Sequence, residues 1–504
     1  MKQTNLRVSL PMTNHHSRFR NRGINNKNIG YRCRPCVWKG LLVFALVVCY
    51  VHFHFTASTV VSSRKKESKR GDQKQAISSS NGLPLIQLPV YPPIRDNMAQ
   101  NSKLMREWND WAKEPMIGSY SFPSLSGNTI DYVIHFPSVD LESVLSQKQH
   151  NNNNDKMSGT SLRTATFSSS RKHLEPVVST RRGNKYSQGE GPSDDEEKEG
   201  TDSEIYRQPN QDRVLLITRN AGNNDKTHSM TKDDFWIGLF DGHGPYGHCV
   251  SQYVSLEVAK RIRKEWDAET EQSQPTDSEI VKDTIKDIFL SINQSMPRLY
   301  GSGSTGIGIW RRGNSLYLSN VGDSVAFVAS FAKNPESSAE PLVDIVYATR
   351  PHKPDMPEER SRIEAVGGTV EDPPFKGATA RLLIPMPDGI QVFGLAMSRS
   401  LGDHDGAKYG LIADPTTDVL DLSTLDSINK EYIVVAATDG IIDHGRLSEQ
   451  EVAQTLAKSF LAEGGIPAGA AEQLIVKASD MWAADAMMQG YRDDQSIVVR
   501  KLVL

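Results

Sequence analysis

Carboxylates stand at the ends of several apolar runs in the C-terminal half of the chain. Asp241-Gly242 and Asp439-Gly440 each close such a run, and Asp493-Asp494 stands just before another. A carboxylate buried at a strand end is unfavourable unless a cation compensates its charge. Mg²⁺ and Mn²⁺ prefer oxygen ligands, and a glycine lets the backbone come close to an ion or its water. The pattern therefore predicts a two-metal hydrolytic site.

Composition limits what else the chain can be. It has 504 residues, a formal net charge of −3 and only 38% hydrophobic residues. The low hydrophobic content is local, which favours one folded domain with long polar extensions. The charge balance excludes a generally basic nucleic-acid-binding protein, so we expect no nucleic-acid partner. Of the four cysteines only Cys249 falls in the expected domain, where we predict a packed core thiol without a disulfide.

The N-terminal region has the features of a membrane segment. Residues 1–39 form a basic N-terminus with nine Lys and Arg and no acidic residue, and residues 40–61 carry no formal charge. These 22 residues can span a bilayer, so we predict a single-pass anchor, with a targeting segment as the alternative. The flanks 20–39 and 62–81 each hold six Lys and Arg, so charge does not determine the orientation.

Residues 62–204 are expected to be largely a disordered linker, in which 84–137 could pack onto the domain as a helix and a strand. From residue 205 strand and helix patterns come in blocks, which favours antiparallel sheets with helices on their outer faces over a doubly wound parallel sheet. The expected strands are 214–217, 235–240, 304–310, 315–320, 325–330, 343–348, 390–396, 432–437 and a last one near the C-terminus. The expected helices are 250–266, one that starts at the capping box Thr276-x-x-Glu279, one that starts at Ser448-x-x-Glu451, and about 468–487.

Eight short motifs become specific when they are taken in order. They are Asn210-Gln211-Asp212, Asp241-Gly242-His243-Gly244, Gly303-Ser304-Thr305, Asn320-Val321-Gly322-Asp323-Ser324, Arg362-Ile363 with Gly367-Gly368-Thr369-Val370, Ser398-Arg399-Ser400-Leu401-Gly402-Asp403, Thr438-Asp439-Gly440 with Asp443, and Asp493-Asp494-Gln495-Ser496. Their order resembles the type 2C (PPM) metal-dependent protein serine/threonine phosphatases over residues 205–504. The resemblance implies an α+β fold in which a central antiparallel β-sandwich is flanked by α-helices on both faces.

The resemblance also implies a set of ligands for two Mg²⁺ or Mn²⁺ ions and a weaker third. Asp241 would bridge the two ions and Gly242 would offer its carbonyl. The remaining positions implied near the ions are Asp439 and Asp493 as direct ligands, Asp212 acting partly through water, and Asp323 and Asp443 at the third ion.

Two further residues would act on the substrate of such an enzyme, which would be a phosphoserine or phosphothreonine protein. Arg207 matches the residue that grips the phosphate, and His243 matches the proposed general acid, consistent with the ordinary imidazole pKa of about 6.5. The nucleophile would be a metal-activated water. Family habit suggests a monomer with its catalytic domain in the cytosol.

Three departures from the family pattern leave alternatives open. The usual Gly is missing upstream of Arg207, so this residue could be an ordinary exposed one. Val325 replaces an Arg after Gly322-Asp323-Ser324, and Asp494 replaces an Asn, so Asp494 could itself be a ligand. No core metal carboxylate is lost, which favours an active enzyme. The competing hypotheses are an inactive binding module and a phosphohydrolase that acts on small phosphate esters.

Overall fold

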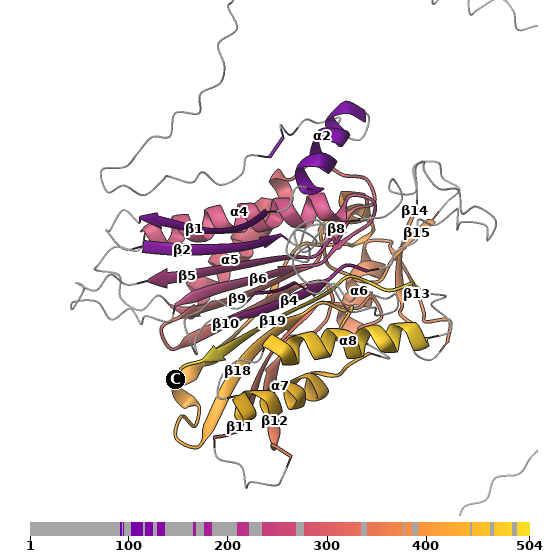
Figure 1. The fold of residues 1–504 in the computed structure, drawn as a ribbon. Helices are drawn as coiled ribbons and strands as arrows, with labels where there is room; N and C mark the ends of the chain where they lie inside the picture. Colours follow the sequence, from indigo (N-terminus) through magenta and orange to yellow (C-terminus); the bar gives the residue numbers. More distant parts are fainter. Residues whose placement is uncertain are drawn as a thin grey trace, which may run out of the picture. The chain divides into compact units, whose positions relative to one another are not determined.

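Two antiparallel sheets form the centre of the structure, a computed structural model (Figure 1). The first has seven strands in the order β1-β2-β5-β6-β9-β10-β17. Their bounds are β1 (Met116–Pro123), β2 (Thr129–Phe136), β5 (Arg213–Asn220), β6 (Phe235–Phe240), β9 (Gly306–Arg312), β10 (Ser315–Val321) and β17 (Thr416–Asp421).

The second sheet has six strands in the order β12-β11-β18-β19-β4-β3. Their bounds are β12 (Val343–Ala348), β11 (Val325–Ala332), β18 (Lys430–Ala437), β19 (Gln495–Leu502), β4 (Val177–Arg181) and β3 (Ala165–Phe167). The structure describes residues 91–92, 94, 102–113, 116–123, 129–136, 165–167, 176–183, 209–220, 234–268, 277–333, 340–375, 378–385, 392–443, 446–463, 468–485 and 491–504. All of them lie in the unit Ala76–Leu504.

Short sheets and helices complete the described part. The small sheets are β13 (Thr369–Glu371), β14 (Arg381–Pro385) and β15 (Val392–Leu395), and β16 (Leu401–Gly402), β8 (Gly303–Ser304) and β7 (Gly242–His243). The helices are α2 (Ser102–Lys113), α4 (Gly247–Ala268), α5 (Ser278–Ser295), α6 (Pro357–Ala365), α7 (Glu449–Glu463) and α8 (Ala468–Ala484), with 3₁₀ turns η2 (His404–Tyr409) and η3 (Leu422–Thr424).

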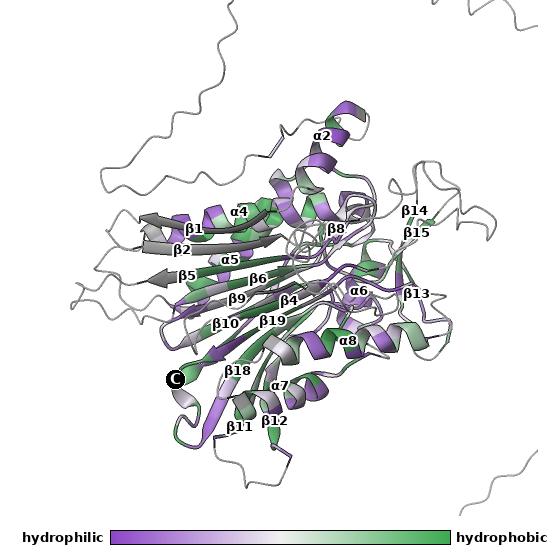
Figure 2. Ribbon diagram, in the orientation of Figure 1, coloured by the Kyte–Doolittle hydropathy of each residue, from purple (hydrophilic) through white to green (hydrophobic). Residues whose placement is uncertain are grey.

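Three hydrophobic clusters stack these elements into layers. Residues of both large sheets, such as Ile237 and Val434, form the cluster between them. The other face of the first sheet packs under α4 and α5 around Trp310, and the other face of the second packs under α7 and α8 around Leu456. Figure 2 shows hydrophobic and hydrophilic residues alternating along α4 and α8, as expected for helices with one buried face.

The alternation of strand side chains explains why both faces of the sheets are buried. In β18, Ile433 and Val435 belong to the cluster under α7 and α8, whereas Val434 and Ala436 belong to the cluster between the sheets. Successive side chains of a strand point to opposite faces, so a strand packed on both faces reads as a continuous apolar run. The predicted combination of helices and antiparallel sheets is therefore confirmed.

An N-terminal helix is part of the same hydrophobic core. Trp108 of α2 is fully buried in the cluster that includes α4, and its backbone oxygen lies 3.5 Å from the Cys249 thiol. Arg213, at the start of β5, donates to the backbone oxygen of Ala112 in α2 (2.9 Å). His248, on α4, is buried and its Nε2 lies 2.9 Å from Asn109 Oδ1 of α2. The α2 helix is therefore part of the hydrophobic core.

Most predicted elements appear near their predicted bounds. The Ser448 capping box forms, with Ser448 N donating to Glu451 Oε2 (3.0 Å) and Glu451 N donating to Ser448 Oγ (3.3 Å). Thr276 lies outside the described residues, and the N-cap of α5 is Asp277, which accepts from Glu279 N (3.1 Å). The predicted strand 304–310 is divided at Thr305 into β8 and β9, which belong to different sheets.

Two predictions concern the region before residue 205, namely the linker and the membrane segment. Residues 177–181 fall in the stretch that the sequence pattern assigns to a linker, and they form β4, which pairs with β19. The predicted membrane segment, residues 40–61, lies outside the described residues. Among the helices that the structure describes, none has the length and apolarity needed to cross a membrane.

Removing the indole of Trp108 tests whether α2 is integral to the domain. We expect Trp108→Ala to lower the free energy of unfolding by about 3–5 kcal/mol, because the change leaves a cavity in a close-packed core. Urea denaturation of the full chain would measure the loss. Lys103→Ala, which removes an exposed side chain from the same helix, should change stability by less than about 0.5 kcal/mol. Equal stability of the two variants would contradict this packing.

Candidate active site

The predicted carboxylates gather where strands of the two sheets end. Asp212 precedes β5, and Asp241 stands between β6 and β7, so both belong to the first sheet. Asp439 follows β18 by one residue and Asp493 precedes β19, so both belong to the second sheet. Asp323 lies in the loop that joins β10 of one sheet to β11 of the other. The fold thus brings together residues that are up to 281 positions apart, between Asp212 and Asp493.

Hydrogen bonds hold the strand ends here, both within each sheet and between the two sheets. Thr438 N donates to the Ser496 backbone oxygen (3.0 Å), and Thr438 Oγ1 lies 3.3 Å from Asp212 Oδ2. Thr305 N donates to the Asp241 backbone oxygen (2.8 Å), and Thr305 Oγ1 lies 2.7 Å from Ser324 Oγ. The hydroxyls of two threonines therefore fix the loops that carry the carboxylates.

The backbone at Gly242 leaves no room for a side chain. Its N–H donates to the Gln211 backbone oxygen (3.2 Å), and a Cβ at this position would lie 2.6 Å from the Gly247 carbonyl carbon and 2.8 Å from the Gln211 oxygen. A glycine is required because the loop after β6, the turn before β5 and the start of α4 meet here. This contact brings Asp212 and Asp241 to the same place.

The surroundings of Asp439 show that the negative charge of the cluster is not fully compensated. Burial raises the pKa of Asp439 well above its usual range, and the nearby charges of Asp493, Asp323 and Asp443 raise it further. Its Oδ1 atom is buried without a hydrogen-bond partner among the described residues. Converging acidic oxygens in a buried position are the donor set that hard divalent cations prefer. The residues present therefore fit Mg²⁺ or Mn²⁺.

The cluster does not by itself form a closed cage. Within the described part of the chain, no three His, Cys, Asp or Glu side chains are grouped closely enough to hold a metal ion alone. This arrangement suits Mg²⁺, which usually keeps several water ligands and binds only one or two carboxylates.

Asp493 and its neighbour Asp494 have different surroundings. Asp494 is buried, and its two carboxylate oxygens accept from Gly183 N (2.6 Å) and Gln211 N (2.9 Å). Its side chain fastens the end of β4 to the turn before β5. Asp493, in contrast, is one of the acids whose charge raises the pKa of Asp439, and its Oδ2 accepts from the Tyr491 hydroxyl (3.1 Å).

Asp403, which the motif pattern alone does not assign to the site, holds the ring of His243. His243 Nε2 lies 2.6 Å from Asp403 Oδ2, and Asp403 Oδ2 also accepts from Ser400 Oγ (2.6 Å). Asp403 has a positive φ of 41°, which is unusual for a residue other than glycine. A Cβ at Gly303 would lie 2.7 Å from His243 Nε2, so the glycine of that motif makes space for the pair. A strained aspartate on a buried loop is a frequent sign of function.

The sequence pattern also did not predict a lysine near the acids, Lys353, whose side chain is only 13% exposed. Lys353 Nζ lies 2.8 Å from Asp323 Oδ2 and 3.7 Å from Asp443 Oδ1. Burial by itself lowers the pKa of Lys353, but the charges of Asp323, Asp443 and Asp439 outweigh it and raise the pKa. The signal in the sequence was a single Lys in a loop, which no spacing rule distinguishes from a surface residue. Arg207, the predicted phosphate-binding residue, lies outside the described residues.

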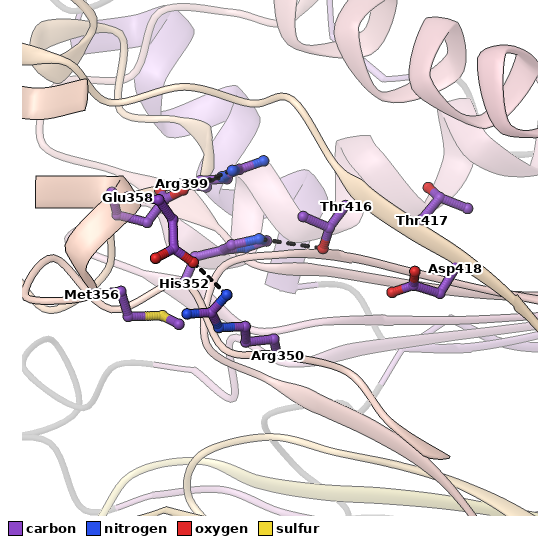
Figure 3. Close-up of a pocket in the computed structure, with 9 residues that line it drawn as sticks. Arg350, His352, Met356, Glu358, Arg399, Thr416, Thr417 and Asp418 are labelled. Atoms are coloured by element: carbon purple, nitrogen blue, oxygen red, sulfur yellow. Dashed lines mark hydrogen bonds and ion pairs between the residues drawn. The ribbon is translucent and has the colours of Figure 1, made fainter. Parts of the chain in front are cut away.

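A cavity of about 380 Å³ is lined by His352, the residue before this lysine, and by several charged side chains (Figure 3). His352 lines it and directs Nε2 toward Thr416 Oγ1 (3.3 Å), while Arg350 pairs with Glu358. Burial lowers the pKa of His352 to about 4, and the positive charge of Arg399 acts in the same direction. A neutral His352 is consistent with its Nδ1 accepting the Gly322 N–H (3.1 Å). The ring thus fixes the loop that carries Asp323.

Known proteins resemble this chain over the region that carries most of the candidate site. A family model described as Protein phosphatase 2C matches residues 202–487. Probable protein phosphatase 2C 73 of Arabidopsis thaliana is 30% identical over 286 residues, which are 53% of this chain and 70% of the relative. Probable protein phosphatase 2C 34 of the same plant is 31% identical over 268 residues, or 51% and 69% of the two chains.

A solved structure gives a further point of comparison. The serine-threonine phosphatase 2C from Toxoplasma gondii aligns over 68% of this chain and 99% of its own, with 18% identity and a TM-score of 0.46. The family model alone covers more than half of the sequence. The resemblance seen in the motifs is thereby confirmed, and the chain belongs to the protein phosphatase 2C family.

Proposed function

We propose that this chain is a Mg²⁺- or Mn²⁺-dependent protein serine/threonine phosphatase that uses two metal ions. The observation that carries the proposal is Asp439, whose Oδ1 atom is buried without a partner among the described residues and whose pKa is raised by the charges of three further acids. Divalent cations would remove the electrostatic cost of this cluster and would make use of its oxygens.

Five residues would hold the two ions. Asp241, Asp439 and Asp493 offer carboxylates, Gly242 offers its carbonyl, and Asp212 acts beside them through water. When bound, the ions provide an activated water near neutral pH and neutralise charge on the phosphate. The threonine hydroxyls and the close contact at Gly242 keep these ligands in place before any ion arrives.

His243 would protonate the departing serine or threonine oxygen. Asp403 holds Nε2 of the ring, so the proton transfer uses Nδ1, and the carboxylate stabilises the imidazolium that delivers the proton. Arg207 would grip the substrate phosphate with its planar guanidinium.

The physiological setting is also part of the proposal. The partners are phosphorylated proteins, and the enzyme acts as a monomer. Residues 40–61 tether it to a membrane with the catalytic domain in the cytosol; the uncharged stretch of 22 residues supports the tether. The alternative of an inactive binding module is disfavoured, because the acidic residues at each ion position are retained.

Removing the charge of Asp439 should separate activity from stability. We expect Asp439→Asn to lower hydrolysis of a phosphothreonine peptide by ~100-fold or more in Mn²⁺, as does EDTA with the wild type. A carboxyl whose folded-state pKa is raised destabilises the folded protein above its unfolded pKa. In EDTA at pH 7 the variant should therefore be more stable than the wild type by about 1 kcal/mol or more.

Phosphate release and urea denaturation of the full chain measure both effects. Asp287→Asn removes an exposed carboxylate from α5 and should change neither. Full activity of Asp439→Asn, or metal-independent activity of the wild type, would rule out the proposed two-ion mechanism.

Asp403→Asn tests the proton donor. The variant should lose about 10- to 100-fold in kcat with a phosphothreonine peptide, whose alkoxide leaving group needs a proton. It should lose much less with p-nitrophenyl phosphate, whose leaving group is stable as an anion. Asp405→Asn, an exposed neighbour in the same turn, serves as the control. Equal losses with both substrates would show that Asp403 acts only through structure.

A further inference from the structure

The ammonium group of Lys353 occupies the space between two of the acids. Its Nζ lies 2.8 Å from Asp323 Oδ2 and 3.7 Å from Asp443 Oδ1. The side chains of Asp323 and Lys353 are only 1% and 13% exposed, so solvent screens this pair far less than a surface ion pair. The charge of Asp439 also acts on Lys353.

Lys353 is held in this position by its own backbone. His352 N donates to the Gly322 backbone oxygen (2.9 Å), and Gly322 N donates to His352 Nδ1 (3.1 Å). These reciprocal bonds join the residue before Lys353 to the residue before Asp323. The His352 carbonyl accepts from Ser398 N (2.9 Å), and Figure 3 shows the bond from the His352 ring to Thr416. The lysine is therefore placed opposite Asp323 by the fold, not by a chance rotamer.

An ammonium ion and a divalent cation compete for the same oxygens. Lys353 already donates to Asp323, and a second positive charge within a few ångströms of Nζ would be strongly repelled in a poorly solvated position. A flexible surface lysine could move away at little cost, but the side chain of Lys353 is only 13% exposed and its flanking backbone is fixed.

We propose that Lys353 is a built-in cation that takes the place of a third metal ion at Asp323 and Asp443, so that the site binds two ions. The inference rests on the proposed two-ion function and assigns the remaining two acids to the lysine. It also gives Asp323 a role in the metal-free protein, as the partner of a fixed positive charge.

Counting bound ions tests this inference directly. Equilibrium dialysis of the full chain against Mn²⁺, followed by metal analysis, should give two ions per wild-type chain. Lys353→Met keeps the length of the side chain and removes its charge. We expect this variant to bind a third ion, at least ~10-fold more tightly than the wild type does. Lys353→Arg, which keeps the charge, should bind two.

Controls separate this inference from the proposed function. Lys430→Met removes an exposed lysine that pairs with Asp344 at 2.7 Å and should leave the count at two. Circular dichroism of each metal-free protein checks folding, and the wild-type count decides the question even if Lys353→Met does not fold. Three ions in the wild type would overturn the role of Lys353 and leave the two-ion enzyme intact. No bound ion would contradict the proposed function, and this inference with it.

Discussion

Repulsion among clustered carboxylates is the constraint on which the rest of this structure depends. Asp493, Asp323 and Asp443 each make the ionisation of Asp439 less favourable. Such a cluster is stable only if the surrounding structure holds it and positive charge compensates it. Lys353 supplies one fixed positive charge, and the unpartnered oxygen of Asp439 indicates where more is needed.

The framework that resists this repulsion is a set of hydrogen bonds, most of them to backbone groups. The hydroxyls of Thr305 and Thr438 connect the ends of the two sheets, and the backbone N–H groups of the same residues bond within each sheet. The Asp494 carboxylate accepts hydrogen bonds from two backbone N–H groups. Such bonds to a charged acceptor are stronger than bonds between neutral groups. Behind the turn before β5, the buried guanidinium of Arg213 donates to the backbone oxygens of Asn210 and Asp212 (2.7 and 2.8 Å). Rigidity at the site is thus provided by many ordinary bonds.

The sequence predicted the parts of the fold that have strong periodicity. The runs 235–240 and 432–437 are strands, and the acids that follow them lie at one end of the two sheets, because an apolar run followed by a turn dipeptide leaves few alternatives. Trp236 and Trp310, which lie in two of the predicted strands, are both fully buried. The candidate site residues were inferred from the order of their motifs, and the family model matches the region that contains most of them.

Other features have no local signal. The short strand β4 lies in a polar region, and only its pairing with β19 reveals it. The roles of Asp403 and Lys353 depend on partners that are 160 and 30 residues away, at His243 and Asp323. Such contacts follow from tertiary structure, which a single sequence read by pattern does not supply.

The strands that precede the family match have a consequence for solubility. β2 pairs with β5, and β4 pairs with β19, so strands before position 202 cover one edge of the remaining strands in each large sheet. A fragment limited to residues 202–504 would expose the unpaired N–H and C=O groups of two long, apolar strands. Uncovered strands of this kind are templates for edge-to-edge association between molecules. The N-terminal strands therefore act as a guard against self-aggregation, in addition to any part they take in folding.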